Sequence, residues 1–375
     1  MRIGFDAKRL YNNFTGLGNY SRFVVEALSK TYPENEYVLF TPRVKINDDT
    51  QYFQTASNVS TVTPPNYISK LKLGSIWRSF SIGQAALKEK VSIYHGLSHE
   101  LPGNMPSSIR KVVTIHDLIF LRYPQFYNRI DVAIYKAKVQ HACKTADKII
   151  AISKQTRNDI IEFLKVDDSK IEVVYQGCHP NFKVSYSQAE INAIKEKYNL
   201  PQQYILNVGT VEERKNLMSL VNALPLIPKE SRVPLVVIGK QTEYYLQVVS
   251  KAKALGVLNE IIFLKDLPFI DFPKIYQGAQ VFVYPSLFEG FGIPLVEAIE
   301  SNIPVITSMG SCFSEAAGPD AIYVNPTDEH ELAFQIANVL SDHQLKNKII
   351  NASKNYIKQF SPEKIAHKLN ALYQM

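Results

Sequence analysis

The segment YPSLFEGFGIPLVEAIE, residues 284–300, carries two carboxylates, a type of group that suits a polyhydroxylated ligand. The apolar run QVFVYPS before it predicts a buried strand of a parallel sheet, and Pro294 followed by LVEAIE predicts the first turn of a helix. Glu289 lies in the tight, glycine-containing loop between them, and we expect Glu297 in the first helical turn. Open α/β sheets bind ligands at the carboxyl ends of their strands. Carboxylate acceptors beside backbone N–H donors therefore predict a ribose or hexose site there.

A second group of residues suits an anion. The segment YILNVGTVEERKN predicts a strand, a turn and a helix, with Arg214 and Lys215 where the helix begins. A helix N-terminus presents unpaired N–H groups and a partial positive charge. A guanidinium and an ammonium at the same place strengthen the attraction for phosphate oxygens. This combination predicts a diphosphate site.

A glycine-containing loop, TGLGNYSR, follows the first expected strand. Gly16 and Gly18 would let its backbone approach a phosphate, with the positive end of the next helix aimed at the same point. The main alternative is a dinucleotide-binding domain. Ser21 replaces the third glycine of that fingerprint, however, and the second strand ends in Phe40–Pro42 without the acidic residue that would hold a ribose. We therefore favour a phosphate site of another class.

A histidine and an aspartate end the expected strand in KVVTIHDL. Because neighbouring strand residues point to opposite faces, His116 and Asp117 are not expected to form a catalytic pair with each other. His95 and His99 have the spacing of a metal pair, but their segment is not evidently helical and no third ligand is visible. The sequence also lacks a D-x-D motif, so we expect no metal site.

Strand and helix patterns alternate along the 375 residues in two successive sets, which predicts an α/β protein of two Rossmann-like, doubly wound domains. Turn residues after VVYQG separate the sets. We expect an N-terminal domain over 1–180, a second domain over 181–355 and a terminal helix over 356–375. Helices are expected over 19–30, 76–90, 128–146 and 187–198, and strands at RIGFDA, YVLFT, VSTVTP, SIYHG, KVVTIHD, KIIAIS, IEVVY, YILNVG, PLVVIG, IIFL, QVFVYPS, PVITS and AIYVN.

Glu289 and Glu297, with seven residues between them and GFGIP after the first, resemble the E-x7-E signature of retaining glycosyltransferases of family 4. That family has the two-domain GT-B fold. The resemblance implies two domains facing across a cleft, with acceptor binding in the first domain and nucleotide-sugar binding in the second. It also implies that the terminal helix crosses back to the first domain. The resemblance extends over essentially the whole chain, and the opening is most similar to bacterial mannosyltransferases.

The resemblance also implies roles for single residues. Arg214 and Lys215 correspond to the basic pair that grips the donor diphosphate, and His116 to a histidine beside the donor sugar. The catalytic residues implied are His116, Glu289, Arg214 and Lys215. The donor-binding residues implied are Gly16, Gly18, Arg214, Lys215, Glu289, Phe291, Gly292, Ile293 and Glu297, with Glu297 on the ribose and the amides after Glu289 near the hexose.

The function implied is metal-independent transfer of a hexose, with mannose favoured, from a nucleotide-diphosphate sugar to a glycan or lipid-linked oligosaccharide, with retention of anomeric configuration. The donor is a co-substrate, and no cofactor is expected. The acceptor would lie against loops 64–75 and 119–129, whose sequences carry no transferable code. Two alternatives stay open: a nucleotide-sugar 2-epimerase of the same fold, and a non-catalytic sugar-binding partner subunit.

Composition and charge narrow the classes further. With 46% hydrophobic and 21% charged residues the chain is typical of a globular protein. The net charge of +7 comes from scattered residues, and the motifs of nucleic-acid-binding modules are absent, so no nucleic-acid partner is expected. We expect a cytoplasmic protein with three reduced cysteines. Its excess of basic residues would suit peripheral contact with the inner face of the cell membrane, and simple solvation of the surface is the alternative that stays open.

Overall fold

The computed structural model describes residues 1–65, 76–78 and 81–375, which form two compact units. Unit 1 comprises Met1–Gly177 with Gln359–Met375, and unit 2 comprises Cys178–Lys358. The expected acceptor loop 64–75 falls largely outside the described residues. So do residues 79–80 of the helix expected over 76–90, of which Ile82–Lys88 is observed as α6.

Unit 1 is built on a seven-stranded sheet with the order β3-β2-β1-β4-β5-β6-β7, in which every pairing is parallel. The strand order reverses on either side of β1, and doubly wound sheets bind their ligands at the carboxyl ends of the strands at such a point, here β1 and β4. The strands are β1 (Arg2–Asp6), β2 (Glu36–Phe40), β3 (Val59–Val62), β4 (Ile93–Gly96), β5 (Arg110–Ile115), β6 (Lys148–Ala151) and β7 (Ile171–Val173).

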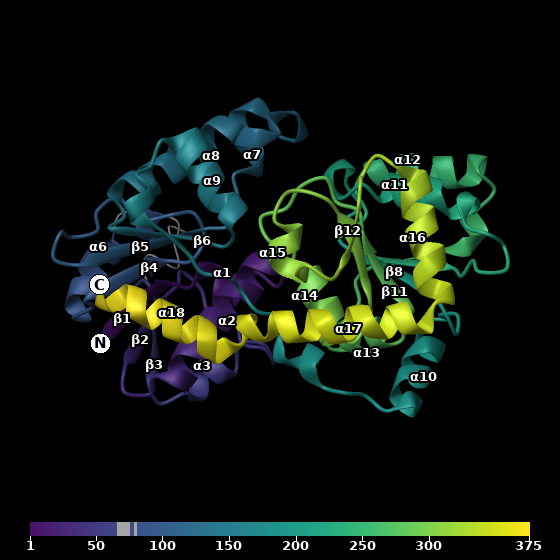
Figure 1. Cartoon of the computed structure of the whole chain (residues 1–375). Helices are drawn as coiled ribbons and strands as arrows, with labels where there is room; N and C mark the ends of the chain where they lie inside the picture. The colour runs from purple at the N-terminus through teal and green to yellow at the C-terminus, as the bar shows by residue number, and fades with distance from the viewer. Residues whose placement is uncertain (66–75, 79–80) are drawn as a thin grey trace. The chain divides into compact units, whose positions relative to one another are not determined.

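The helices of unit 1 include the last helix of the chain, α18, which lies beside α2 (Figure 1). Ser361 caps α18 by accepting from the amide of Lys364, and Pro362 occupies its first turn. The α-helices are α1 (Lys8–Asn12), α2 (Gly16–Thr31), α3 (Tyr52–Thr55), α6 (Ile82–Lys88), α7 (Ile119–Arg122), α8 (Arg129–Thr145), α9 (Lys154–Leu164) and α18 (Pro362–Gln374), with short 3-10 turns at Pro124–Phe126 and Asp168–Lys170.

Unit 2 contains a six-stranded parallel sheet with the order β10-β9-β8-β11-β12-β13, whose strand order reverses between β8 and β11. Its strands are β8 (Ile205–Val208), β9 (Leu235–Ile238), β10 (Ile261–Leu264), β11 (Val281–Tyr284), β12 (Val305–Ser308) and β13 (Ile322–Val324). Its α-helices are α10 (Gln188–Lys197), α11 (Leu217–Ala223), α12 (Tyr244–Ala254), α13 (Phe272–Gln277), α14 (Ile293–Glu300), α15 (Phe313–Ala317), α16 (Glu329–Ser341) and α17 (His343–Ile357).

The apolar strand sequences explain this architecture. Every residue of β8, β9, β11 and β12 is buried, as a parallel sheet covered on both faces requires. The amphipathic helices α11 and α16 pack on one another with their apolar faces in the same core. Two doubly wound parallel α/β units confirm the predicted fold class. Within the described ranges, every helix is too short or too polar to span a bilayer.

Candidate active site

Of the two glutamates singled out in the sequence, Glu289 lies in the loop between β11 and α14 of unit 2, and Glu297 lies within α14. Gly292 precedes the helix with φ +98°, a left-handed conformation that glycine adopts without strain. Because α14 begins at Ile293, Pro294 lies in its first turn, as predicted, whereas Glu297 is the fifth helical residue. The expectation that Glu297 lies in the first turn is therefore wrong: it begins the second.

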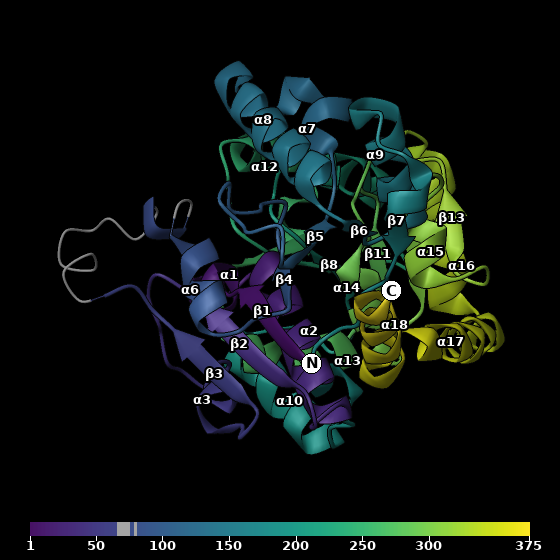
Figure 2. The same cartoon turned by 90° about the vertical axis from the view of Figure 1, so that its left-hand side faces the viewer.

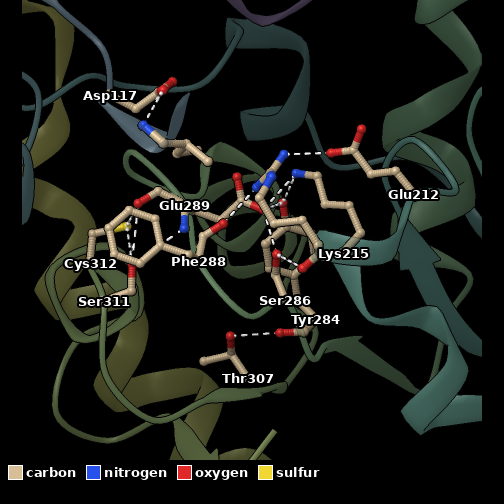
Figure 3. Close-up of polar contacts among 12 residues, drawn as sticks. Asp117, Glu212, Lys215, Tyr284, Ser286, Phe288, Glu289, Thr307, Ser311 and Cys312 are labelled. Carbon is tan, nitrogen blue, oxygen red and sulfur yellow. Dashed lines mark hydrogen bonds and ion pairs between the residues drawn. The ribbon is translucent and has the colours of Figure 1, made fainter. Parts of the chain in front are cut away.

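Glu289 is buried, and its carboxylate gathers cations and hydroxyls around one oxygen (Figure 3). Oε1 accepts from Nζ of Lys215 at 2.6 Å, from the hydroxyl of Ser286 at 2.6 Å and from that of Tyr284 at 3.0 Å. A guanidinium nitrogen of Arg214 lies 2.9 Å from the same oxygen. Burial alone would raise the pKa of Glu289, but the two cations outweigh it and hold that pKa at about 2.

The main chain of Glu289 is also held, by two residues of the loop after β12. Its amide donates to the hydroxyl of Ser311 at 3.3 Å, and its carbonyl accepts from Ser311 at 3.2 Å and from the thiol of Cys312 at 3.2 Å. Ser311 itself has φ +48°. The sequence interpretation did not single out these two residues, or Tyr284 and Ser286, because their contacts with Glu289 depend on the fold.

The basic pair lies in a single 3-10 turn, Glu213–Lys215, that precedes α11. Asn216 follows in the left-handed conformation, φ 54°, and the α-helix begins only at Leu217. Arg214 and Lys215 thus lie in a helical turn just before α11, and Asn216, a residue type that tolerates the left-handed conformation, separates them from the α-helix. The Asn216 side chain donates to the carbonyls of Pro285 at 3.1 Å and Pro326 at 2.7 Å, which ties the turn to the end of β11.

Arg214 has two further acceptors. It donates to the carbonyl of Phe288 and to a carboxylate oxygen of Glu212, each at 2.6 Å (Figure 3). The cations Arg214 and Lys215 are thus matched by the carboxylates Glu212 and Glu289. The structure therefore brings together three of the predicted residues, Arg214, Lys215 and Glu289, in an electrically balanced group.

Glu297 lies in a different environment. It is buried on α14 and accepts a hydrogen bond of 3.0 Å from the hydroxyl of Tyr276. Burial raises the pKa of Glu297 to about 7, and the Tyr276 hydrogen bond only partly opposes this. The two glutamates, which the sequence pattern treats alike, therefore differ in charge: Glu289 stays ionised, and Glu297 titrates near neutrality.

Glu297→Gln is expected to flatten the pH dependence of stability between pH 5 and 8. The pKa of Glu297 is about 7 in the folded protein, whereas its ordinary value is 4.5. As pH rises from 4.5 to 7, Glu297 loses its proton in the unfolded chain but keeps it in the folded protein. The free energy of unfolding therefore falls with rising pH, by up to about 3 kcal/mol. Wild type should become less stable than Glu297→Gln as pH rises, measured by urea denaturation. Parallel curves for the two proteins would contradict this assignment.

In unit 1 the glycine loop is part of a helix. α2 begins at Gly16, not at residue 19 as expected, so Gly18 lies in its first turn. The amide of Gly18 donates to the side chain of Asn13 at 3.2 Å, and a Cβ on Gly18 would lie 1.7 Å from the Asn13 carbonyl oxygen. Around Gly16 there is open space. Gly18 is therefore required by close backbone packing, whereas Gly16 lies free of such contacts.

His116 follows β5 and is buried. Its Nε2 donates to the carbonyl of Leu97 at 2.9 Å, so the neutral ring carries its proton on Nε2. Burial, and then the neighbouring His99, lower the pKa of His116 to about 3. Asp117 accepts from the amide of Ile119 at 3.1 Å and so begins the turn into α7. These contacts hold His116 as an uncharged ring.

Comparison with known proteins identifies the class of enzyme to which this site belongs. Residues 15–182 match the family described as Glycosyltransferase Family 4, and residues 189–356 match Glycosyl transferases group 1. Together the two matches cover every strand of the two sheets except β1. The chain belongs to the family 4-like glycosyltransferases with the GT-B fold.

Individual relatives refine the comparison. The chain is 28% identical over 379 residues to O-antigen chain mannosyltransferase B of Escherichia coli, with 97% of each chain covered. It is 27% identical over 360 residues to O-antigen chain mannosyltransferase RfbU of Salmonella typhimurium, with 94% of each covered. Anabaena HepE, solved in complex with UDP and glucose, shares the fold over 100% of both chains with a TM-score of 0.75 at 16% identity. The protein is a hexosyltransferase.

Proposed function

We propose that the enzyme transfers mannose from a nucleotide-diphosphate sugar, GDP-mannose being favoured, to a glycan or lipid-linked oligosaccharide of a bacterial surface polysaccharide. The observation that carries this proposal is the group of buried Glu289 with partly buried Arg214 and Lys215 at the carboxyl end of β8 and β11. Cations there suit a diphosphate, and a carboxylate among them suits sugar hydroxyls. The mannosyltransferase relatives support the choice of sugar.

The proposed reaction keeps the anomeric configuration. The bond between the anomeric carbon and the diphosphate oxygen breaks, and the acceptor oxygen bonds to that carbon on the same face. The departing phosphate oxygen takes the acceptor's proton. Negative charge grows on the diphosphate, where Arg214 and Lys215 stabilise it.

The remaining residues would bind and orient the donor. In this proposal Glu297 accepts from the ribose hydroxyls, and Glu289 with the amides of Phe291, Gly292 and Ile293 holds the hexose. In unit 1, Gly16 and Gly18 would approach the diphosphate, and His116 would contact a sugar hydroxyl. The neutral state of His116 suits this contact, because an uncharged ring offers an acceptor nitrogen.

We further propose that transfer needs no metal ion and no cofactor, because two protein cations already face the position of the leaving diphosphate. Thermal-shift measurements with GDP, UDP, ADP and their sugars should show a selective shift that EDTA leaves unchanged. A ligand at a hundredfold its Kd adds about 2.7 kcal/mol of stability. A shift abolished by EDTA would overturn metal independence, and no shift with any nucleotide would overturn the donor site.

We also propose that the protein lies in the cytoplasm and contacts the inner face of the cell membrane, and α8 is the surface that supports this contact. α8 lies at the outer edge of unit 1 (Figure 2), and among its residues only Val139, Ala142 and Cys143 are buried. Three large apolar side chains are exposed, Ile130 by 69%, Ile134 by 47% and Tyr135 by 44%. Four cations against one acid, Asp131, give this helix a net charge of +3; they are Arg129, Lys136, Lys138 and Lys144. Apolar and basic side chains on one exposed helix favour an anionic bilayer surface.

Replacing both Ile130 and Ile134 with Glu is expected to weaken binding to anionic phospholipid vesicles by about tenfold or more, because two apolar anchors are lost and two negative charges are added. Vesicle sedimentation measures the effect. Leu246→Glu on α12 is the control, because Leu246 is equally apolar and 68% exposed. Equal binding by the double variant and wild type would exclude α8 as the contact surface.

A further inference from the structure

Four buried side chains connect the last helix of the chain to the neighbourhood of His116. The hydroxyl of Tyr373 on α18 lies 2.7 Å from Nδ1 of His95 on β4. Nε2 of His95 lies 2.8 Å from the hydroxyl of Thr114 on β5, and that hydroxyl lies 3.1 Å from the hydroxyl of Tyr20 on α2. None of the four is more than 3% exposed. We call this series, Tyr373–His95–Thr114–Tyr20, the relay.

The protons of the relay are ordered. Burial lowers the pKa of His95 to about 3, so its ring is neutral and has one donor and one acceptor nitrogen. If Tyr373 donates to Nδ1, then Nε2 must donate to Thr114. If Thr114 donates to Nε2, then Nδ1 must donate to Tyr373. A change at either end therefore alters hydrogen bonding through to the other end.

The relay ends against the ring of His116. The ring of Tyr20 meets that of His116 edge-on, with centroids 4.6 Å apart and planes at 85°. On another side Nε2 of His116 is held by the Leu97 carbonyl, and the His116 carbonyl accepts from the hydroxyl of Thr156 at 3.1 Å. The position of Tyr20 is thus one of the restraints that fix the imidazole.

Simple packing does not need such a relay. Four buried polar side chains do not stabilise a protein more than apolar side chains of similar shape unless each has its hydrogen-bond partners. The last helix is also joined to α2 without it, through a hydrogen bond of 2.6 Å between the hydroxyl of Tyr32 and Nδ1 of His367. The attachment of α18 to unit 1 therefore does not depend on the relay, and the relay is available to orient the side chains that it connects.

We propose that the C-terminal helix belongs to the catalytic apparatus: Tyr373, His95, Thr114 and Tyr20 are positioning residues that hold the imidazole of His116 in the orientation that meets the donor sugar. This inference rests on the role proposed above for His116. It gives α18 a function in turnover beyond covering the sheet of unit 1.

Tyr→Phe variants of the full-length enzyme test the inference, because the chain offers a matched control. Tyr373→Phe and Tyr32→Phe each remove one hydroxyl bonded to a histidine at the attachment of α18, but only Tyr373 is in the relay. We expect Tyr373→Phe to lower kcat about tenfold, with KM for the donor within about twofold, because a small misplacement of a reacting group is costly. Tyr32→Phe should match wild type. Tyr20→Phe, at the other end, should behave like Tyr373→Phe, and the double variant should be no worse than Tyr20→Phe.

A spectroscopic readout separates position from activity. The side-chain 15N signals of His116 should shift in Tyr373→Phe and stay unchanged in Tyr32→Phe. Unchanged His116 signals in a folded Tyr373→Phe, or equal kcat for the two variants, would overturn the inference; if Tyr373→Phe does not fold, Tyr20→Phe decides by the same criteria. His116→Ala with wild-type kcat would instead refute the proposed role of His116, whatever the spectra of the relay variants show.

Discussion

Lys215→Met should reduce kcat/KM for the nucleotide sugar by about 100- to 1000-fold, the usual loss when one group that stabilises developing negative charge is removed. The ammonium of Lys215 lies 2.6 Å from Glu289 and 2.6 Å from the hydroxyl of Tyr284, so its position is fixed before any donor binds. A fixed cation needs no reorganisation as the diphosphate leaves. Methionine keeps most of the length and the apolar stem, and it removes the charge and the hydrogen-bond donors of Nζ.

Steady-state kinetics of the purified variant measure this loss. Lys253→Met is the control, because Lys253 is an exposed lysine in the last turn of α12 in the same unit. Glu289 remains ion-paired to Arg214 in Lys215→Met, so the variant should fold. Near-wild-type kcat/KM would remove Lys215 from the donor site and with it the main support for the proposed mechanism.

Glu289→Gln should destabilise unit 2 by about 3–5 kcal/mol, because it leaves two partly buried cations without their shared counter-charge. The amide keeps the shape and an acceptor oxygen, so the change isolates the charge. Wild type should also lose stability as pH falls from 4.5 toward 2, since the pKa of Glu289 is about 2 when folded and ordinarily 4.5. The variant should lack that part of the acid dependence. Urea unfolding at several pH values measures both effects.

Glu300→Gln provides the comparison for that measurement. Glu300 ends α14, and its nearest cation, Nζ of Lys183, lies at 3.8 Å. A long ion pair of this kind contributes little, so Glu300→Gln should stay within about 1 kcal/mol of wild type. Equal destabilisation by the two variants would mean that the charge of Glu289 is not what stabilises the site.

The sheets could be predicted from the sequence because their strands are continuous runs of apolar residues. VFVY and LVVI become β11 and β9, buried on both faces, and parallel pairing follows from the helices between them. Pro294 likewise marks the first turn of α14. These are local signals, which depend on a few neighbouring residues.

The local sequence is ambiguous where one residue type can adopt two backbone conformations or can be required by two kinds of contact. The sequence predicts Asn216 within a helix start, but its left-handed backbone separates the 3-10 turn from α11. At Gly18 the structure shows a close approach to Asn13, and the role of Gly18 toward a phosphate stays a prediction. A glycine indicates that another group packs closely against the backbone, but the local sequence does not identify that group.

Contacts between distant residues lay beyond sequence reasoning altogether. Ser311 and Cys312 reach Glu289 across 22 and 23 residues, and Tyr373 reaches His95 across 278. No periodicity records such pairs, because they exist only once β11 and β12, or α18 and β4, pack together. The residues that orient the candidate site were for this reason harder to find than the residues that form it.

The balanced group of Arg214, Lys215, Glu212 and Glu289 is expected to make the proposed donor site selective among anions. Inorganic phosphate or sulfate arriving there would have to compete with carboxylates already in contact with the cations, and it brings no hydroxyls with which Glu289 could replace its lost partners. A sugar diphosphate brings both an anion for the cations and donors for the carboxylate. We therefore expect the built-in counter-ions to disfavour binding of simple anions and to favour a molecule that carries phosphate and sugar together.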